Sequence, residues 1–408
     1  MRRFLIILSI CPALAAQDAA ELLAKMKAME ARIQALEKEV AALKTAPAAP
    51  AAVTVSEAPQ EKSAEPLPPA LGQRTSTLPY YGPAVQSSKI FNPDMAAIGT
   101  FAGAAGSPGS RPGYALEMSE AEVAVQAIVD PYARADFFFS FGEKGVELEE
   151  GYLTLSALPG GFQARAGKMR AVFGKVNTFH LHTLPWVDRP LVTQNLLGGE
   201  EGISDAGLSI SRILPAPKGV FLEATAQVYR GDSEGVFQSY RRDNLGTVGR
   251  LRGYRDLSES TNIDLGASYA RGHSPLGPSL TTQLYGLDAT LRWKPLRRAI
   301  YHSFLARTEA VWGRAQQPEA VAKPFGYYVS GEYQLARRWL VGGRFDRSDR
   351  LESALRDTGG SILLTYRPSE FSQIRGQIRR TRYGERMTAN EFLFQFQYSI
   401  GAHGAHPF

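Results

Sequence analysis

Two histidines separated by one residue are the side chains in this chain best suited to bind a metal ion. His180 and His182 lie between two predicted strands. The charged residues that follow in the same segment are Asp188, Arg189, Glu200 and Glu201. Neutral imidazole and carboxylate groups are zinc ligands, so the histidines could hold zinc with Asp188 and the two glutamates. Two histidines in a loop are a weak signal for a metal site. The alternative, which we favour, is an ordered loop whose polar side chains hydrogen-bond to one another and to the barrel wall.

Arginines are concentrated late in the chain. Residues 337–386 contain twelve Arg, six acidic residues and no Lys, a net charge of +6 that equals the formal charge of the whole chain. The arginines expected on polar strand faces are Arg165, Arg292, Arg307, Arg344, Arg375 and Arg379. Carboxylates expected on the same faces are Glu147, Glu149, Glu223, Asp264, Asp288, Glu309 and Glu332. Charge around an aqueous passage selects ions by sign, so this mixture predicts a hydrophilic pore with a mild anion preference.

The elements that carry these side chains alternate between apolar and polar residues. Every even position from 392 to 400 is aromatic or aliphatic, and the positions between are mostly polar. The same period of two, typical of a strand with two different faces, recurs at 133–141, 220–228, 263–270 and 285–293. Charges on the second face require water there, because a charge facing lipid costs about 2–4 kcal/mol near the midplane. Aromatic residues near strand ends are typical of membrane barrels.

Counting the alternating segments gives sixteen strands. They are 95–106, 115–129, 132–142, 146–157, 162–173, 204–213, 219–230, 245–255, 261–271, 281–294, 301–314, 325–336, 339–347, 359–367, 372–383 and 391–401. Tight connections, such as 130–131 and 337–338, alternate with longer ones, such as 174–203. An even strand number and this asymmetry are typical of bacterial outer-membrane barrels. We therefore predict an all-β fold, an antiparallel transmembrane β-barrel of about 16 strands over residues 95–408.

Three different segments precede the predicted barrel. Residues 1–16 have two arginines, an apolar run and Ala13-Leu14-Ala15, the pattern of a signal peptide. Residues 17–44 carry apolar residues at alternating spacings of four and three with opposite charges on the flanks, which predicts a coiled-coil helix. Residues 45–94 are rich in Pro and Ala and predict an extended linker. The single cysteine, Cys11, lies in the expected signal peptide, which excludes a disulfide framework.

This arrangement of export signal, coiled coil, linker and barrel resembles bacterial outer-membrane porins. The order of the segments is most similar to the phosphate-selective O/P-type porins, which carry an amino-terminal coiled coil and form trimers. The resemblance implies a barrel in contact with outer-membrane lipid, a coiled coil in the periplasm and a homotrimer formed through both. The connection 174–203 corresponds to the porin loop that folds into the lumen. The resemblance makes it a pore constriction loop containing His180, His182, Asp188, Arg189, Glu200 and Glu201.

Two short stretches resemble a second family, the exported proteins labelled zinc-regulated TonB-dependent outer-membrane receptors. They are residues 129–137, Val-Asp-Pro-Tyr-Ala-Arg-Ala-Asp-Phe, and residues 167–175, Gly-Lys-Met-Arg-Ala-Val-Phe-Gly-Lys. A TonB-dependent transporter has about 22 strands and a plug in its lumen. Here a heptad helix and a Pro-rich linker precede the barrel, so we do not expect energised transport.

Three functions fit these observations. The one we favour is a channel for passive diffusion of small hydrophilic solutes or ions, which needs no cofactor. The alternatives are a zinc-uptake protein that binds metal at His180 and His182, and a structural barrel whose coiled coil contacts peptidoglycan. No nucleophile elbow, paired-histidine metal helix or phosphate-binding glycine loop occurs in a suitable context, so we expect neither an enzyme nor a nucleic-acid partner.

Overall fold

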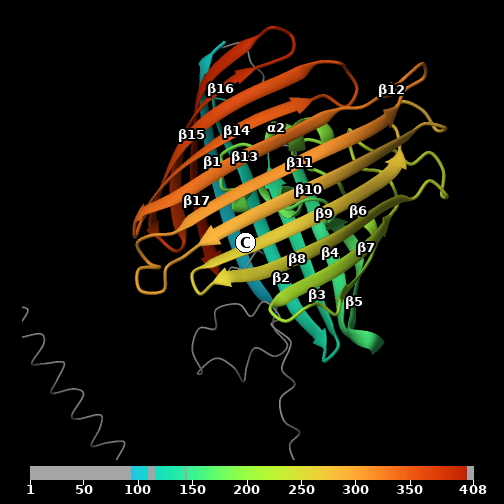
Figure 1. The fold of residues 1–408 in the computed structure, drawn as a ribbon, viewed down its shortest axis with the longest axis horizontal. Helices are drawn as coiled ribbons and strands as arrows, with labels where there is room; N and C mark the ends of the chain where they lie inside the picture. The colour runs from blue at the N-terminus through green and yellow to red at the C-terminus, as the bar shows by residue number, and fades with distance from the viewer. Residues whose placement is uncertain (1–92, 109–114, 143–144, 402–408) are drawn as a thin grey trace, which may run out of the picture. The chain divides into compact units, whose positions relative to one another are not determined.

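The computed structural model describes residues 93–108, 115–142 and 145–401. The expected signal peptide, the coiled coil, and the linker as far as residue 92 lie outside these residues. The described part is a sheet of strands that closes on itself (Figure 1). Among the described residues, no helix is long and apolar enough to cross a membrane.

The strands follow one another around the sheet in chain order. They are β1 (Asp94–Ser107), β2 (Leu116–Asp130), β3 (Ala133–Gly142), β4 (Gly145–Leu158), β5 (Phe162–Arg170), β6 (Ser204–Ile213), β7 (Val220–Tyr229), β8 (Gly246–Ser258), β9 (Thr261–His273), β10 (Thr281–Trp293), β11 (Phe304–Gln316), β12 (Val321–Ala322), β13 (Phe325–Ala336), β14 (Trp339–Asp349), β15 (Arg356–Ser369), β16 (Ser372–Arg382) and β17 (Thr388–Gly401). Each pairs antiparallel with its neighbours, and β1 pairs with β17 from Ala96 opposite Gly401 to Ser107 opposite Asn390. The two-residue β12 lies in the connection between β11 and β13, which pair directly. Sixteen strands therefore form the wall, and the predicted all-β antiparallel barrel is confirmed.

The connections differ between the two ends of the barrel. At one end they are mostly short, as at 131–132 and 337–338, while the other end carries 171–203 and 230–245. The connection 294–303 departs from this trend, because β11 begins at Phe304 rather than at 301. The start of β1 lies beside the end of β17, so the barrel begins and ends at the end with the short turns.

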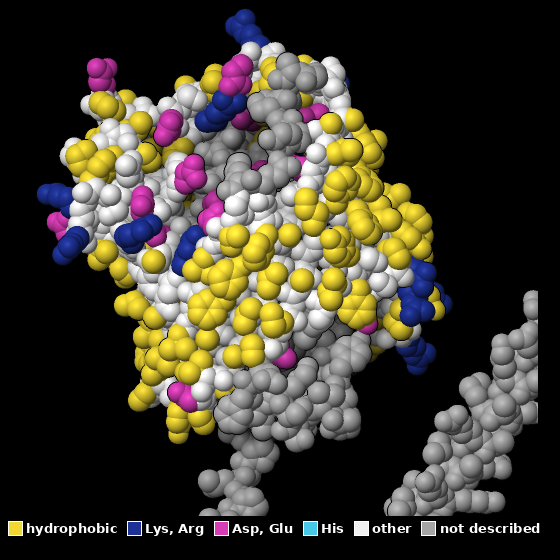
Figure 2. All heavy atoms as spheres, turned by 180° about the vertical axis from the view of Figure 1, so that it is seen from behind, with side chains coloured by type: hydrophobic (Ala, Val, Ile, Leu, Met, Phe, Trp, Pro, Cys, Tyr) yellow, Lys and Arg dark blue, Asp and Glu magenta, His cyan; other side chains and the backbone are white. Residues whose placement is uncertain are grey.

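The outer surface is a belt of apolar side chains. Residues of one parity stay exposed along neighbouring strands, including Leu287 on β10, Val329 on β13 and Ile378 on β16. Figure 2 shows hydrophobic side chains over much of one face, with charged ones gathered near its edges. Such a surface suits a lipid environment, where the closed sheet leaves no backbone hydrogen bond unmade at an edge.

Aromatic rings lie near both rims of this belt. Trp339 and Tyr366, at the short-turn end, have ring centroids 4.6 Å apart. Trp312 and Phe325, at the opposite end, have centroids 5.3 Å apart. Aromatic rings at both ends of the wall are typical of the girdles of membrane barrels.

Candidate pore constriction and acid–histidine cluster

The connection 171–203, here called the lumen loop, folds into the barrel rather than away from it. It leaves β5 at Arg170 and forms two short 3₁₀ turns, Val176–Thr178 and Leu181–Thr183, and the helix α2 (Leu191–Leu196). Its backbone and side chains bond to inward-facing side chains on β2, β7, β9, β11, β14 and β16. Phe173, Leu184 and Trp186 are buried to 2% exposure or less, in a core between the loop and the wall. The loop thus spans the lumen (Figure 1).

The loop enters the lumen across β9 and β11. Oε1 of Glu309 accepts the backbone N–H groups of Lys175 and Val176, each at 2.7 Å. The carbonyl oxygen of Gly174 accepts a hydrogen bond from Nη1 of Arg250, at 2.7 Å. Gly174 has φ of 61°, and a Cβ there would lie 2.8 Å from Oε2 of Glu309. The chain turns so tightly against the wall here that only glycine fits this position.

Beyond this turn the loop meets acidic side chains of β2 and β4. The resulting group, here called the acid–histidine cluster, consists of Glu120, Glu122, Glu149, Glu150, His180 and His182. Nδ1 of His180 lies 2.8 Å from Oε2 of Glu122 and 3.1 Å from Oε2 of Glu149. Nε2 of the same ring lies 2.8 Å from Oε2 of Glu150. Both ring nitrogens of His180 therefore face carboxylates.

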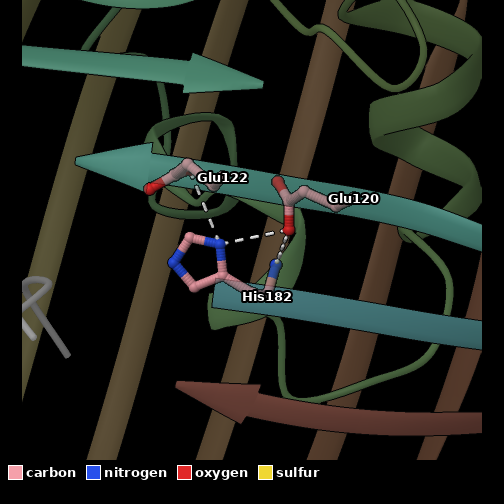
Figure 3. Close-up of side chains that lie close together, drawn as sticks. All are labelled: Glu120, Glu122 and His182. Atoms are coloured by element: carbon pink, nitrogen blue, oxygen red, sulfur yellow. Dashed lines mark hydrogen bonds and ion pairs between the residues drawn. The ribbon is translucent and has the colours of Figure 1, made fainter. Parts of the chain in front are cut away.

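His182 makes the second half of the cluster. Its Nδ1 lies 3.1 Å from Oε2 of Glu120 and 3.6 Å from Oε2 of Glu122, and Figure 3 shows the ring with both glutamates. The backbone N–H of His182 also donates to Oε2 of Glu120, at 3.1 Å. Glu122 is shared by the two histidines and its side chain is fully buried. The prediction that the histidines hydrogen-bond to the surrounding structure is compatible with this geometry, which also brings metal-ligand atoms together.

A β-bulge aims two adjacent glutamates of β4, Glu149 and Glu150, inward. Phe138 of β3 lies opposite Glu150, while Phe139 lies opposite Leu148, so Glu149 is an extra residue. Strict alternation would send one of two adjacent side chains out to lipid, whereas here both are buried. The guanidinium of Arg170 compensates part of their charge, with Nη2 2.9 Å from Oε2 of Glu149.

The far part of the loop is fixed by a different set of side chains, on β14 and β16. This arginine anchor consists of Asp188 of the loop and of Arg344, Arg375, Gln377 and Arg379 of the wall. Oδ2 of Asp188 accepts Nη2 of Arg344 at 2.9 Å and Nη1 of Arg379 at 2.5 Å. Oδ1 of Asp188 accepts Nε2 of Gln377 at 2.5 Å. Asp188 therefore pairs with arginines, in contrast to its expected place beside the histidines.

Arg375 holds the loop without a carboxylate partner in its hydrogen bonds. Its Nη1 donates to the carbonyls of Leu184 and Trp186, at 2.9 and 3.3 Å, and to Oε1 of Gln395 at 2.9 Å. The side chain is 1% exposed. The guanidinium of Arg344 also lies 4.9 Å from the ring centre of Trp186. These arginines fix the loop in place and face little solvent.

The remaining predicted site residues fall into different surroundings. Arg189 is buried and donates to the carbonyls of Val176 and Phe179. Glu200 is exposed, while Oε2 of Glu201 lies 3.8 Å from Nη2 of Arg170. Of the other predicted lumen arginines, Arg307 is buried and Arg165 and Arg292 are half-buried. The structure therefore does not bring Glu200 and Glu201 into contact with the histidines as metal ligands.

The surroundings of the loop shift its titratable groups in opposite directions. Burial by itself lowers the pKa of His180, but its hydrogen bonds with Glu122, Glu149 and Glu150 raise it well above its usual value. Burial raises the pKa of Asp188, but Arg344 and Arg379 outweigh this effect and hold it at about 2. Burial and the nearby Arg170 lower the pKa of Arg189 to about 9.

The sequence pointed to the two histidines but not to their partners. Glu120 and Glu122 lie two residues apart, so they face the same side of β2. That spacing, next to the adjacent Glu149 and Glu150, is the signal that could have indicated an acidic patch. What the sequence could not supply is the path that carries the loop across the lumen to it.

A protein from Aquifex aeolicus (strain VF5), named only as an uncharacterized protein, is 30% identical over 336 residues. The alignment covers 72% of this chain and 70% of that one. The chain belongs to the same family as this Aquifex protein. No family model matches the sequence.

Solved structures of outer-membrane proteins are similar to this chain in fold. An anion-selective porin from Comamonas acidovorans has a TM-score of 0.55 at 10% identity, covering 76% of this chain and 99% of that chain. A loop-deletion mutant of OmpT, an outer membrane protein of Vibrio cholerae, has a TM-score of 0.53 at 10% identity, with coverage of 76% and 100%. The outer membrane channel DcaP of Acinetobacter baumannii has a TM-score of 0.50 at 11% identity, with coverage of 76% and 96%. The fold is that of a porin-type outer-membrane barrel.

Proposed function

We propose that the protein is an outer-membrane channel for passive diffusion of small hydrophilic solutes or ions. The observation that carries the proposal is the lumen loop, tied to inward-facing side chains on opposite parts of the wall. A fixed loop across a barrel sets the width of the passage beside it. The porin-type fold supports a location in the outer membrane, and the aromatic rims support contact with its lipid.

The charges that remain partly exposed inside the barrel would set the selectivity. Arg134 and Arg252 have side chains 40% and 38% exposed, and Arg165 and Arg292 are half-buried. Half-buried Glu223 and Glu332 oppose them. Lumen charge biases the ions that pass, so a mild anion preference follows from the excess of arginine. The arginines of the anchor bond to the loop and face little solvent, so they are not available to bind phosphate along a path. This supports a general pore better than a dedicated phosphate path.

The assembly we propose is a homotrimer, with an amino-terminal coiled coil in the periplasm assisting its formation. One of the structures with this fold is OmpT of Vibrio cholerae in a trimer form, with a TM-score of 0.53 at 10% identity. Mass measurement of the purified protein in detergent would give three chains per particle. A single chain per particle would contradict the trimer.

Planar-bilayer recording tests the channel and its selectivity together. With the full-length protein and a KCl gradient, we expect steady ohmic current and a reversal potential of the sign given by an anion-preferring pore. A reversal potential of the opposite sign would contradict the anion preference. Absence of current from folded protein would contradict the channel and favour the structural barrel.

A zinc-uptake function is supported less well by the same geometry. A transport site must take up and release its ion, whereas the side chains of His180, His182 and Glu122 are all at most 3% exposed. Metal that enters such a cluster would stay there and act on the loop.

A further inference from the structure

We propose that the acid–histidine cluster is a binding site for one divalent transition-metal ion of the zinc class. The ion would be held by His180, Glu122 and Glu149, which form one of two groups of three donors that share Glu122; Glu120, Glu122 and His182 form the other. The ion would join β2 and β4 to the lumen loop. The metal site does not depend on conduction, so it stands whether or not the barrel is a channel.

The distances between the donor atoms carry this proposal. Zinc bonds to nitrogen and oxygen at about 2.0–2.2 Å, so two donors on one tetrahedral ion lie roughly 3.3 Å apart. The four contacts between the Nδ1 atoms and the carboxylate oxygens of Glu120, Glu122 and Glu149 measure 2.8, 3.1, 3.1 and 3.6 Å. The donors therefore already stand at ligand spacing, in two groups of three that share Glu122.

The orientation of His180 is a second, independent observation. A metal-bound imidazole usually gives its other ring N–H to a carboxylate, which fixes the ring and raises its basicity. With Nδ1 turned to Glu122 and Glu149, Nε2 of His180 lies 2.8 Å from Oε2 of Glu150. Glu150 is itself fixed, because its Oε1 accepts the backbone N–H of Arg170 at 2.7 Å.

Charge and burial favour a cation at the same place. The side chain of Glu122 is 0% exposed, and among the described residues its Oε1 has no hydrogen-bond partner. When the histidines are neutral, as metal ligands must be, the four glutamates and Arg170 have a net charge of −3 before the ion is counted (four negative charges and one positive). Buried charges in proteins are paired or bind metals. One divalent ion reduces the net charge to −1, and a second would reverse its sign, so the balance favours one ion.

The chemistry of the donors selects the kind of ion. Imidazole with carboxylate suits zinc and its divalent neighbours, while calcium and magnesium prefer oxygen ligands alone. Zinc should therefore bind much more tightly than magnesium. Because the ion replaces protons on the imidazoles, binding should release protons into the buffer.

Calorimetry on full-length protein in detergent, after treatment with a chelator, tests the site. Titration with zinc chloride should give one ion per chain and a Kd in the micromolar range or below. Glu122→Gln should weaken binding at least tenfold, whereas Glu147→Gln should leave it unchanged, since Glu147 is a 56% exposed residue of β4 paired with Lys168. Equal affinity for all three proteins, or binding no tighter than that of magnesium, would overturn the proposal.

A spectroscopic measurement on the unmodified protein covers the case in which Glu122→Gln does not fold. Cobalt(II) added to the chelator-treated protein should give visible absorption bands of a low-coordinate site, which zinc then removes. Folded wild-type protein without these bands would also overturn the proposal. Absence of bilayer current beside normal cobalt bands would reject the channel and leave the metal site intact.

Discussion

Replacing Asp188 by Asn should release the lumen loop from the arginine anchor. The Asp188 carboxylate accepts hydrogen bonds from Arg344, Arg379 and Gln377, and the Arg344 side chain is 1% exposed. Removing one partner of a buried ion pair costs about 3–5 kcal/mol, because the other charge stays buried. In this variant Arg344 retains its ion pair with Asp346, and Arg379 retains its ion pair with Glu391. We therefore expect the lower end of the range, about 3 kcal/mol.

The effect should be local and can be measured as hydrogen exchange of the loop amides by mass spectrometry. A loss of about 3 kcal/mol corresponds to about 100-fold faster exchange, at 1.4 kcal/mol for each factor of ten. Amides of β9 and β10 should exchange as in the wild type. Glu147→Gln, which removes a half-exposed ion pair with Lys168, should change exchange by less than tenfold. Loop protection in Asp188→Asn equal to that in this control would refute the anchoring role of the pair.

The other predictions concern the same loop and the barrel interior. Arg375→Lys should speed exchange of the loop amides about tenfold or more, because one ammonium cannot replace a guanidinium that bonds to two carbonyls and Gln395. Since Asp188 has a pKa of about 2, against about 3.9 when unfolded, its carboxylate stabilises the fold above pH 4. That stabilisation, about 2–3 kcal/mol, should disappear as the pH falls from about 4 to about 2. Melting curves of the wild type, followed by circular dichroism, should show this acid loss, and those of Asp188→Asn should lack it. In a Cys11→Ser background, Arg292→Cys should react with a charged thiol reagent added to the channel and reduce its current, whereas Leu291→Cys on the outer face should not. Equal responses of the two cysteines would contradict the inward orientation of Arg292.

The barrel could be predicted from the sequence because lipid and water act on alternate residues of every strand. The predicted strand 204–213 matches β6, and 391–401 lies within β17. The period-two pattern needs no knowledge of distant residues. The short-turn asymmetry at 131–132 and 337–338 is likewise local, because it depends on strand ends alone. The wall of sixteen strands follows from these local signals.

The interior of the barrel could be predicted only in part. The histidines are recognisable as a pair, but their carboxylate partners lie far away in the sequence. Glu150 of β4 is 30 positions from His180, and Glu120 of β2 is 62 positions from His182. The bulge that turns both Glu149 and Glu150 inward breaks the alternation on which the strand prediction rests. Asp188 was grouped with the histidines because it is close to them in sequence. The path of the loop across the lumen takes it to Arg344 and Arg379 instead.

The resemblance to porins predicts that the connection 174–203 folds into the lumen, and the structure places 171–203 inside the barrel. The arginines of β14 and β16 that contact this loop differ from the simplest expectation, in which they line a water-filled passage. Arg344, Arg375 and Arg379 are each at most 8% exposed and hold the loop, so they contribute less to ion selection than their number suggests. The selectivity we propose depends instead on the partly exposed arginines of the lumen, Arg134, Arg165, Arg252 and Arg292.

The most direct test of the central claim, that the lumen loop sets the passage of a diffusion channel, is the single-channel current of three proteins in planar bilayers. Wild type and Glu147→Gln should carry the same steady ohmic current. Asp188→Asn should carry a larger and noisier current, because its loop leaves the arginine anchor. No current from folded wild type, or an identical current from Asp188→Asn whose loop amides exchange faster, would contradict the claim.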